Sequence, residues 1–240
     1  MKTKDLLVSG ADELGQKLNT EQIDQFLDYL DILRKWNQKM NLTAIDDPEQ
    51  IVVKHFLDSI SCASAIDLTS EEKIIDLGTG AGFPGIPLKI LYPSLELTLL
   101  DSTKKRITFL KNLVRKLGLD KIEFIHGRAE DYGQKKEYRQ GFDIVISRAV
   151  ASLNILSEYS VPFLKPSGSF LAQKGAKVKE EVVEATRAIE VLGAEIYDVV
   201  PINLPYTDAE RNLVIIDKIR ETPLKYPRKA GTPSQEPISN

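Results

Sequence analysis

The sequence predicts an α/β fold, in which an N-terminal helical extension precedes a mostly parallel, doubly wound sheet with an antiparallel edge strand. Apolar residues in the first 70 positions recur at the three- and four-residue steps of helices. From about residue 72, short apolar runs alternate with longer amphipathic stretches, which is typical of parallel strands covered by helices on both faces. We therefore divide the chain into a helical extension (1–70), a sheet domain (71–220) and a tail (221–240).

The helical extension is predicted from three apolar stripes. The first spans residues 7–18, and the second spans 23–40 and follows Asn19 and Gln22, which have the spacing of a capping box. Pro48 indicates the start of a third helix, because proline is favoured in the first turn of a helix. The single cysteine, Cys62, follows on this segment and is expected to be a small buried apolar residue.

Seven short apolar runs predict the strands of the sheet. The last two runs have no clear helix between them, so we expect them to form an antiparallel pair at an edge. The predicted strands are residues 73–77, 95–100, 122–125, 142–146, 169–172, 195–199 and 213–217.

Composition limits the function classes that fit. The 240 residues have a formal net charge of −3 and one cysteine. An intrachain disulfide is therefore impossible, and any contact with nucleic acid must depend on local basic patches. No apolar run approaches the ~20 residues of a membrane-spanning helix. The N-terminus lacks the pattern of a secretion signal, so we expect a cytoplasmic protein.

A glycine loop after the first predicted strand is the strongest functional signal. Gly80, Gly82 and Gly85 match a dinucleotide-binding pattern, whereas Gly78, Gly80 and Gly82 after Asp76 match the acidic glycine loop of methyltransferases. A carboxylate at Asp76 would repel a pyrophosphate but attract the sulfonium and ammonium of S-adenosylmethionine. The loop therefore favours S-adenosylmethionine as cofactor, with a nicotinamide-dependent oxidoreductase as the alternative.

Two further strand ends suit a nucleoside. Asp101 closes the second strand, where an acid can accept the ribose hydroxyls, although it could instead cap the next helix. The third strand leads into Ala129 and Glu130, whose backbone and carboxylate can flank an adenine. Glu130 alone would be a weak signal, because an acidic residue in a solvent-exposed loop would give the same sequence pattern.

Cations and a histidine mark the substrate side. Arg148 ends the fourth strand, where a guanidinium can bind a carboxylate, a phosphate or a guanine edge. Lys54, His55 and Asp58 lie within about one helical turn, and a positive group there could hold the methionine carboxylate. A packing and capping cluster explains that spacing equally well. We expect no metal site.

The chain as a whole resembles a known family in a series of motifs that covers nearly its full length. These motifs are WNQKMNLT (36–43), KHFLDS (54–59), DLGTGAGFPGIPLKI (76–90), LDSTKKRITFL (100–110), GRAED (127–131), SRAVA (147–151), KG (174–175) and YPRKAGTP (226–233). They are similar to those of the bacterial RsmG family, also called GidB (glucose-inhibited division protein B), which has the Rossmann-like class I methyltransferase fold. The family often has proline where this chain has Ala230.

The resemblance implies transfer of a methyl group from S-adenosylmethionine to N7 of one guanine in 16S ribosomal RNA. It also implies cofactor contacts from Gly78, Phe83, Ala129, Glu130 and Arg148. Guanine N7 has an in-plane lone pair, so the reaction needs alignment rather than a general base or a nucleophile. We expect Arg148 and His55 to position the substrate.

The tail is the predicted RNA contact. It is rich in proline and polar residues and is expected to be extended or partly disordered. Lys225, Tyr226, Arg228 and Lys229 combine an aromatic ring with cations, which suits stacking and phosphate binding on 16S ribosomal RNA, the small subunit or an assembly intermediate. In the alternative, the tail packs on the domain and stabilises it. A non-catalytic RNA-binding or assembly factor remains a rival function.

Overall fold

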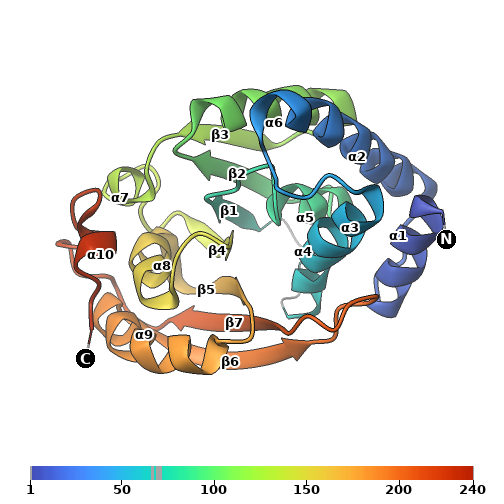
Figure 1. Ribbon diagram of the computed structural model, residues 1–240. Coiled ribbons are helices and arrows are strands. Elements are labelled where there is room, and N and C mark those ends of the chain that lie inside the picture. Colours follow the sequence, from blue (N-terminus) through green and yellow to red (C-terminus); the bar gives the residue numbers. More distant parts are fainter. Residues whose placement is uncertain (1, 66–67, 69–71, 240) are drawn as a thin grey trace.

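A computed structural model describes residues 2–65, 68 and 72–239. Within these residues, one sheet of seven strands lies between two layers of helices (Figure 1). The strand order is β3-β2-β1-β4-β5-β7-β6. The strands are β1 (Lys73–Leu77), β2 (Glu96–Asp101), β3 (Ile122–His126), β4 (Phe142–Arg148), β5 (Leu164–Lys174), β6 (Ala194–Ile202) and β7 (Arg211–Lys218).

All seven predicted strands are confirmed, and β1 to β5 pair in parallel. Strand β7 runs antiparallel to both β5 and β6. The predicted antiparallel pair therefore forms, with β6 at the edge and β7 one place inside it. The cause is the connection between them, because a link without a crossover helix returns the chain in the opposite direction.

The helical extension has the predicted order. Asn19 and Gln22 form the capping box at the start of the second helix, and Asp47 caps the third helix at Gln50 N. That third segment passes through a π-helical turn that contains His55. The segments are α1 (Thr3–Glu13), α2 (Thr20–Met40), α3 (Pro48–Ile51), the π-helical turn η1 (Val52–Leu57), α4 (Asp58–Ile60) and the 3₁₀-helical turn η2 (Ser61–Ser64).

The remaining helices follow the strands. The boundary expected between the extension and the sheet domain, at residues 70 and 71, lies outside the described residues. The helices after it are α5 (Gly85–Leu91), α6 (Lys104–Leu117), α7 (Ala129–Tyr132), α8 (Leu153–Ser160), the 3₁₀-helical turn η3 (Val161–Phe163), α9 (Val178–Leu192) and α10 (Thr232–Gln235). Among the described residues, no helix is both long and apolar enough to cross a membrane.

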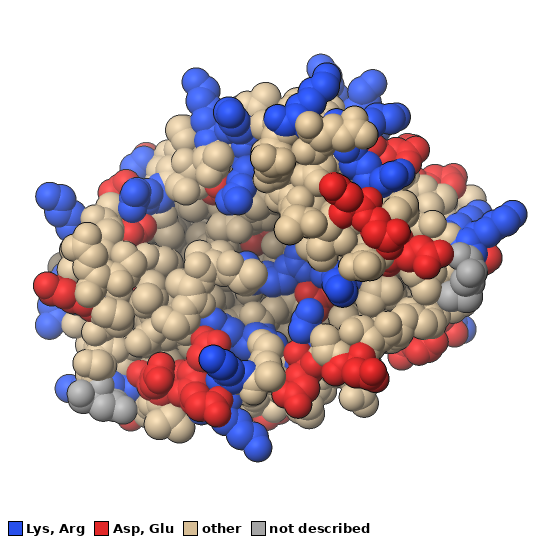
Figure 2. Space-filling view, viewed as in Figure 1, with Lys and Arg blue, Asp and Glu red and all other residues tan. Residues whose placement is uncertain are grey.

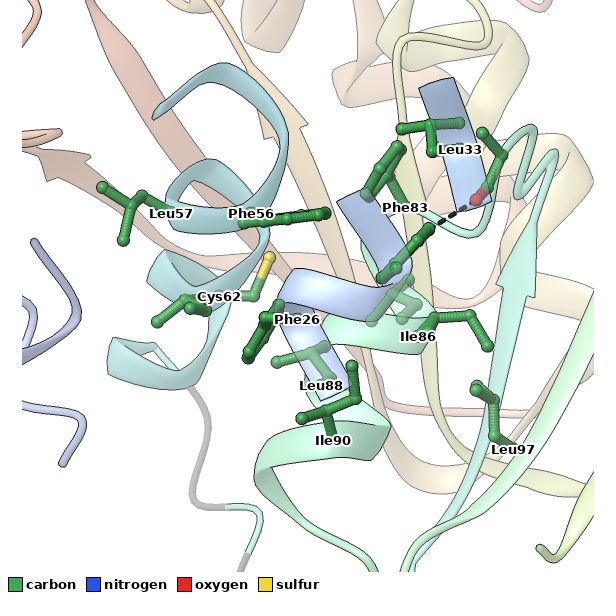
Figure 3. Close-up of a cluster of buried hydrophobic side chains, with 14 of the residues drawn as sticks. Phe26, Leu33, Phe56, Leu57, Cys62, Phe83, Ile86, Leu88, Ile90 and Leu97 are labelled. Carbon is green, nitrogen blue, oxygen red and sulfur yellow. Dashed lines mark hydrogen bonds between the residues drawn. The ribbon is translucent and has the colours of Figure 1, made fainter. Parts of the chain in front are cut away.

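The helical extension packs on the sheet through a continuous apolar cluster that it shares with α5, α6 and one sheet face. The rings of Phe26 and Phe56 lie 5.2 Å apart at the centre of this cluster (Figure 3). Cys62 belongs to the same cluster and is 1% exposed, as predicted. A second cluster on the opposite face joins α8 and α9 to the sheet. The extension is thus bound to the sheet by buried apolar area, the main stabilising term in folding.

The tail packs against the domain, which is the alternative expectation, instead of being partly disordered. Tyr226 is 8% exposed and belongs to the second apolar cluster. Arg139 donates hydrogen bonds to the Tyr226 carbonyl at 2.6 Å and to the Thr222 carbonyl at 2.7 Å. These contacts satisfy backbone groups of a proline-rich segment that has little regular structure. Helix α10 then lies beside α8 (Figure 1).

Candidate functional site

The glycine loop between β1 and α5 needs its glycines for backbone reasons. Gly78, Gly80 and Gly82 have φ angles of 71°, 61° and 103°. Side chains with a Cβ rarely adopt this left-handed region. At Gly82 an added Cβ would also lie 2.7 Å from the Tyr29 hydroxyl oxygen. The predicted tight turn is therefore present at the carboxyl end of β1, where open α/β sheets bind ligands.

Asp76 shapes this loop from inside the domain. Its Oδ2 accepts hydrogen bonds from Thr79 Oγ1 at 2.8 Å and from Gly85 N at 2.9 Å. The residue is 0% exposed, and burial raises the pKa of its carboxyl to about 7. Its other oxygen, Oδ1, accepts no hydrogen bond from the described residues, so the expected role of Asp76 beside a cofactor cation stays a prediction. The acid before the glycine loop nevertheless marks the loop correctly, because the hydroxyl of Thr79 and the amide of Gly85 need a hydrogen-bond acceptor.

Asp101 joins the loop to the start of α6. Its Oδ2 accepts from Gly80 N at 3.0 Å and from Arg106 Nη1 at 3.2 Å, and its Oδ1 accepts from Thr103 N at 2.7 Å. Asp101 thus holds the backbone at Thr103, the residue just before α6, although α6 has no side-chain cap of its own, and the ribose role of Asp101 stays a prediction. The contact with Gly80 adds a link to the glycine loop that sequence spacing alone did not predict.

A crevice of about 210 Å³ opens beside the glycine loop. Gly78, the start of α7, Val150 and α8 contribute to its lining, and Gly78 lies against Val150. Apolar side chains line its interior, and Glu130 lies at its edge. The lining residues are Leu77, Gly78, Leu100, Ser102, Gly127, Arg128, Ala129, Glu130, Val150, Leu156 and Tyr159. The structure therefore brings together Gly78, Ala129 and Glu130, as predicted, although they lie far apart in the sequence.

The tail reaches this crevice through Glu130. The Gly231 amide donates to Glu130 Oε1 at 2.9 Å, and Glu130 is 5% exposed. On the neighbouring helix α8, the carboxylate of Glu158 is 1% exposed and accepts hydrogen bonds from Arg228 through both of its oxygens. The tail thus holds two buried carboxylates beside the crevice.

A second and larger cavity, of about 460 Å³, lies at the carboxyl ends of β4 and β5. We call it the basic cavity, because four cationic side chains and two carboxylates line it. Figure 2 shows Lys and Arg side chains gathered in the hollow at the middle of this face. Residues 149 and 151 line the basic cavity, whereas residue 150 lines the crevice. The charged lining residues are Lys54, Asp58, Arg148, Lys174, Glu181 and Arg211.

Asp58 organises the basic cavity. It is 3% exposed and accepts from Arg148 Nη1 at 2.7 Å and from Arg211 Nε at 3.0 Å, using a different oxygen for each. The two guanidinium groups are therefore held in fixed positions around one buried charge. This arrangement corresponds to the packing alternative for the Lys54–Asp58 segment, because Asp58 is an anchor for cations and Lys54 is exposed.

His55 and Phe83 form a stacked wall next to this anchor. Their ring centroids lie 4.6 Å apart, and the guanidinium carbon of Arg148 lies 5.0 Å from the centroid of Phe83. Tyr29 stacks on Phe83 at 5.3 Å, and Phe83 is 5% exposed. His55 Nε2 lies 2.8 Å from Thr43 Oγ1. Phe83 therefore links the core of the helical extension to the predicted positioning residues His55 and Arg148.

The predicted RNA-binding residues of the tail divide into two pairs. Lys225 and Lys229 are exposed. Tyr226 is buried, and the side chain of Arg228 is engaged by Glu158. The prediction that all four face RNA is therefore wrong for Tyr226 and Arg228. The sequence could not reveal that a buried carboxylate 70 residues earlier binds Arg228.

Sequence reasoning also missed three residues of the basic cavity: Gln173, Glu181 and Arg211. Arg211 lies at the start of β7, and it reaches Asp58 because β7 runs antiparallel beside β5. A polar pair after a buried strand, Gln173 and Lys174, was the available signal for the end of β5. Among the described residues, no cluster of three or more potential metal ligands occurs.

Replacing Asp101 with alanine should destabilise the fold by ~1.5–3 kcal/mol, the range for hydrogen bonds to a charged group. The backbone amides of Gly80 and Thr103 would each lose their acceptor. We also expect weaker binding of S-adenosylhomocysteine, since Gly80 would no longer be held. Urea unfolding and calorimetry measure the two effects, and an unchanged free energy of unfolding would refute the anchoring role.

His55 should make stability depend on pH. Burial, helped by the charge of Arg148, lowers its pKa from 6.5 to about 4, so the folded ring stays neutral over this interval. The unfolded chain takes up this proton near pH 6.5, so stability falls as the pH falls from 6.5 toward 4. Because Asp76, with its raised pKa, has the opposite slope, the test compares wild type with His55→Asn. Between pH 6.5 and pH 4, we expect the free energy of unfolding of the variant to fall by ~2–3 kcal/mol less than that of wild type. Equal slopes in urea unfolding would exclude this contribution.

Comparisons with known proteins agree with this geometry. The family model described as GidB, rRNA small subunit methyltransferase G, matches residues 22–214. A protein of Alkaliphilus oremlandii named ribosomal RNA small subunit methyltransferase G is 52% identical over 99% of this chain and 100% of its own length. A protein of the same name from Acetivibrio thermocellus is 49% identical over 100% of this chain and 98% of its own.

Solved structures support the fold. A precorrin-6y C5,15-methyltransferase from Geobacter metallireducens superposes with a TM-score of 0.51 and 14% identity, over 68% of this chain and 87% of its own. At that identity the likeness concerns the Rossmann-like fold alone. The family match over most of the chain and the full-length relatives are decisive: this chain belongs to the rRNA small subunit methyltransferase G family.

Proposed function

We propose that this protein transfers the methyl group of S-adenosylmethionine to N7 of a guanine in 16S ribosomal RNA. It would act in the cytoplasm, on the small ribosomal subunit or an assembly intermediate. The names of its relatives support a ribosomal RNA substrate. The structural observation that carries the proposal is the crevice beside the glycine loop, which adjoins the basic cavity across residues 149–151. Residues 149–151 would therefore line both the site of the methyl donor and the site of the guanine that accepts the methyl group.

The crevice has the chemistry that an adenosyl group requires. Leucine side chains suit the faces of an adenine, and Glu130 with the backbone of Ala129 suits its polar edge. The backbone at Gly80 allows close approach of the amino acid part, since a Cβ there would have 3.9 Å of clearance from the nearest atom, whereas Val150 already packs against Gly78. We assign cofactor binding to Gly78, Gly80, Ala129 and Glu130, and assign the ordering of the loop to Asp76, Gly82, Phe83 and Asp101.

The reaction requires no proton transfer by a side chain of this protein. The bound cofactor would supply an electrophilic methyl group on its sulfonium. Guanine N7 has a lone pair in the ring plane and no proton to lose. His55, with a pKa of about 4, is neutral and a weak base at pH 7. We therefore assign positioning roles to His55 and Arg148, so that proximity and orientation supply most of the acceleration.

Two exposed basic surfaces are candidates for RNA phosphates. One is the outer side of α6, and the other consists of Lys225 and Lys229 in the tail. Each phosphate contact would contribute a salt-dependent part of the affinity. The exposed cations of α6 are Lys104, Lys105, Lys111, Arg115 and Lys116.

Two assays test this proposal against its rivals. S-adenosylhomocysteine should raise the melting temperature, because a ligand that binds only the folded state stabilises it, whereas NADH should have no effect. Labelled methyl from S-adenosylmethionine should then enter RNA of the small subunit. A shift with NADH alone would favour an oxidoreductase, and a cofactor shift without methyl transfer to RNA would favour a non-catalytic factor.

A further inference from the structure

The basic cavity contains a polar side chain that its own surroundings leave incompletely paired. Gln173 lies near the end of β5, pairs in register with Arg148 of β4, and is 6% exposed. Its Nε2 donates to the Asp58 carbonyl at 2.6 Å. Its Oε1 is buried and accepts no hydrogen bond from the described residues. A buried acceptor without a donor is unfavourable, so its retention calls for an explanation.

The orientation of this amide is determined by its neighbour. Exchanging the oxygen and nitrogen of the Gln173 side chain would place two carbonyl oxygens 2.6 Å apart, at the contact with Asp58. The unpaired atom is therefore the oxygen, which calls for a ligand that donates an N–H or O–H. The rest of the lining limits the ligand further, because four cations face only two carboxylates. An anionic ligand with an N–H donor, such as a guanine nucleotide, meets both conditions.

We propose that Gln173 Oε1 accepts a hydrogen bond from the exocyclic N2 amino group of the target guanine, with the nucleotide phosphate held by the cations of the basic cavity. This inference rests on the proposed guanine-N7 activity and assigns its base specificity to Gln173. Adenine carries no amino group at C2, and cytosine and uracil carry a carbonyl there. For a base that presents its C2 position to Gln173, the acceptor would therefore favour guanine over the other three bases.

The strand order is consistent with this orientation of the base. On a purine, N2 and N7 lie at opposite ends of the ring system. Strand β5, with Gln173, and strand β1, with the glycine loop, lie on opposite sides of β4. A guanine whose amino group meets Gln173 would therefore extend across the end of β4 and direct N7 toward the crevice. Arg148 and residues 149–151 lie along this path.

The test compares GMP with IMP, which lacks only the N2 amino group. Calorimetry in the presence of S-adenosylhomocysteine should give wild-type protein an affinity for GMP about 3- to 10-fold above that for IMP, as expected for one hydrogen bond. Gln173→Met should bind both nucleotides equally, since methionine has similar length and no strong acceptor. Gln173→Glu should keep the preference for GMP, because it retains an acceptor oxygen.

The two variants control for a structural role. Both variants lose the hydrogen bond to the Asp58 carbonyl. If Gln173 had only a structural role, the two variants should therefore show the same ratio of GMP to IMP affinity. Melting temperature and S-adenosylhomocysteine affinity report whether each variant folds, and if Gln173→Met does not fold, wild type and Gln173→Glu still decide. Equal affinities of wild type for GMP and IMP, including no binding of either, would overturn the inference, as would a preserved preference in Gln173→Met. Methyl transfer by wild type to small-subunit RNA is measured separately, so failure of this inference differs from failure of the proposed function.

Discussion

Replacing Arg228 with glutamate is expected to lower the free energy of unfolding by ~3–5 kcal/mol, because it removes the partner of a buried carboxylate and also puts a like charge beside it, although the Arg228 side chain is 27% accessible. Arg228 donates to both carboxylate oxygens of Glu158, with distances of 2.6 Å from Nη2 and 2.9 Å from Nε, and Glu158 is 1% exposed. The variant would place a second negative charge beside this carboxylate. Because the same tail segment binds Glu130, S-adenosylhomocysteine affinity should fall as well.

Lys229→Glu is the matched control, because it makes the same change of charge at the next residue, which is exposed. We expect it to keep the stability and cofactor affinity of wild type. Its RNA affinity should fall, with a log–log salt slope reduced by ~0.7–0.9 if Lys229 contacts one phosphate. Urea unfolding, calorimetry and RNA binding across a salt series measure these effects. Wild-type stability in Arg228→Glu would show that the tail does not hold the domain together.

Replacing Asp58 with alanine should have the second largest effect. The guanidinium groups of Arg148 and Arg211 would lose their shared carboxylate and repel each other. Both arginines are partly exposed, with 14% and 28% of their side-chain surface accessible, so we expect a loss of stability of ~2–3 kcal/mol, below that of a fully buried pair. Methyl transfer should fall by about 100-fold, since small displacements of positioning groups are costly.

The control for Asp58 is Asp208→Ala, which removes an exposed carboxylate and changes the net charge equally. It should leave both stability and methyl transfer unchanged. Asp58→Ala should affect turnover on RNA more than affinity for S-adenosylhomocysteine, because Asp58 does not line the crevice. Wild-type turnover in a folded Asp58→Ala variant would remove the basic cavity from the catalytic site.

Local patterns in the sequence predict most of the fold. All seven strands are confirmed, because buried parallel strands produce apolar runs and covering helices produce amphipathic ones. The capping box at Asn19 and the turn at Gly78, Gly80 and Gly82 were likewise local features. The position of β7 between β5 and β6 was not predictable, because strand order depends on pairing between distant segments.

The site was predicted less completely for the same reason. Strand ends pointed to Gly78, Glu130 and Arg148, which the structure places in the lining of the two cavities, since they occupy one edge of a parallel sheet. Contacts between residues far apart in the chain, such as Arg211 with Asp58 and Arg228 with Glu158, have no local signature. The sequence pattern around a cationic side chain is the same whether that side chain faces RNA or pairs with a buried carboxylate.

Mapping the methyl group on RNA tests the central claim most directly. Small subunits from cells that lack this protein are incubated with the purified protein and S-adenosylmethionine, and their 16S RNA is analysed by cleavage chemistry specific for N7-methylguanosine and by mass spectrometry of nucleosides. We expect one guanosine to gain a methyl group at N7, and expect the initial rate of this gain to be about 100-fold lower with Asp58→Ala. A methyl group on another atom or another base, or no methyl group in RNA from a protein that binds the cofactor, would contradict the account.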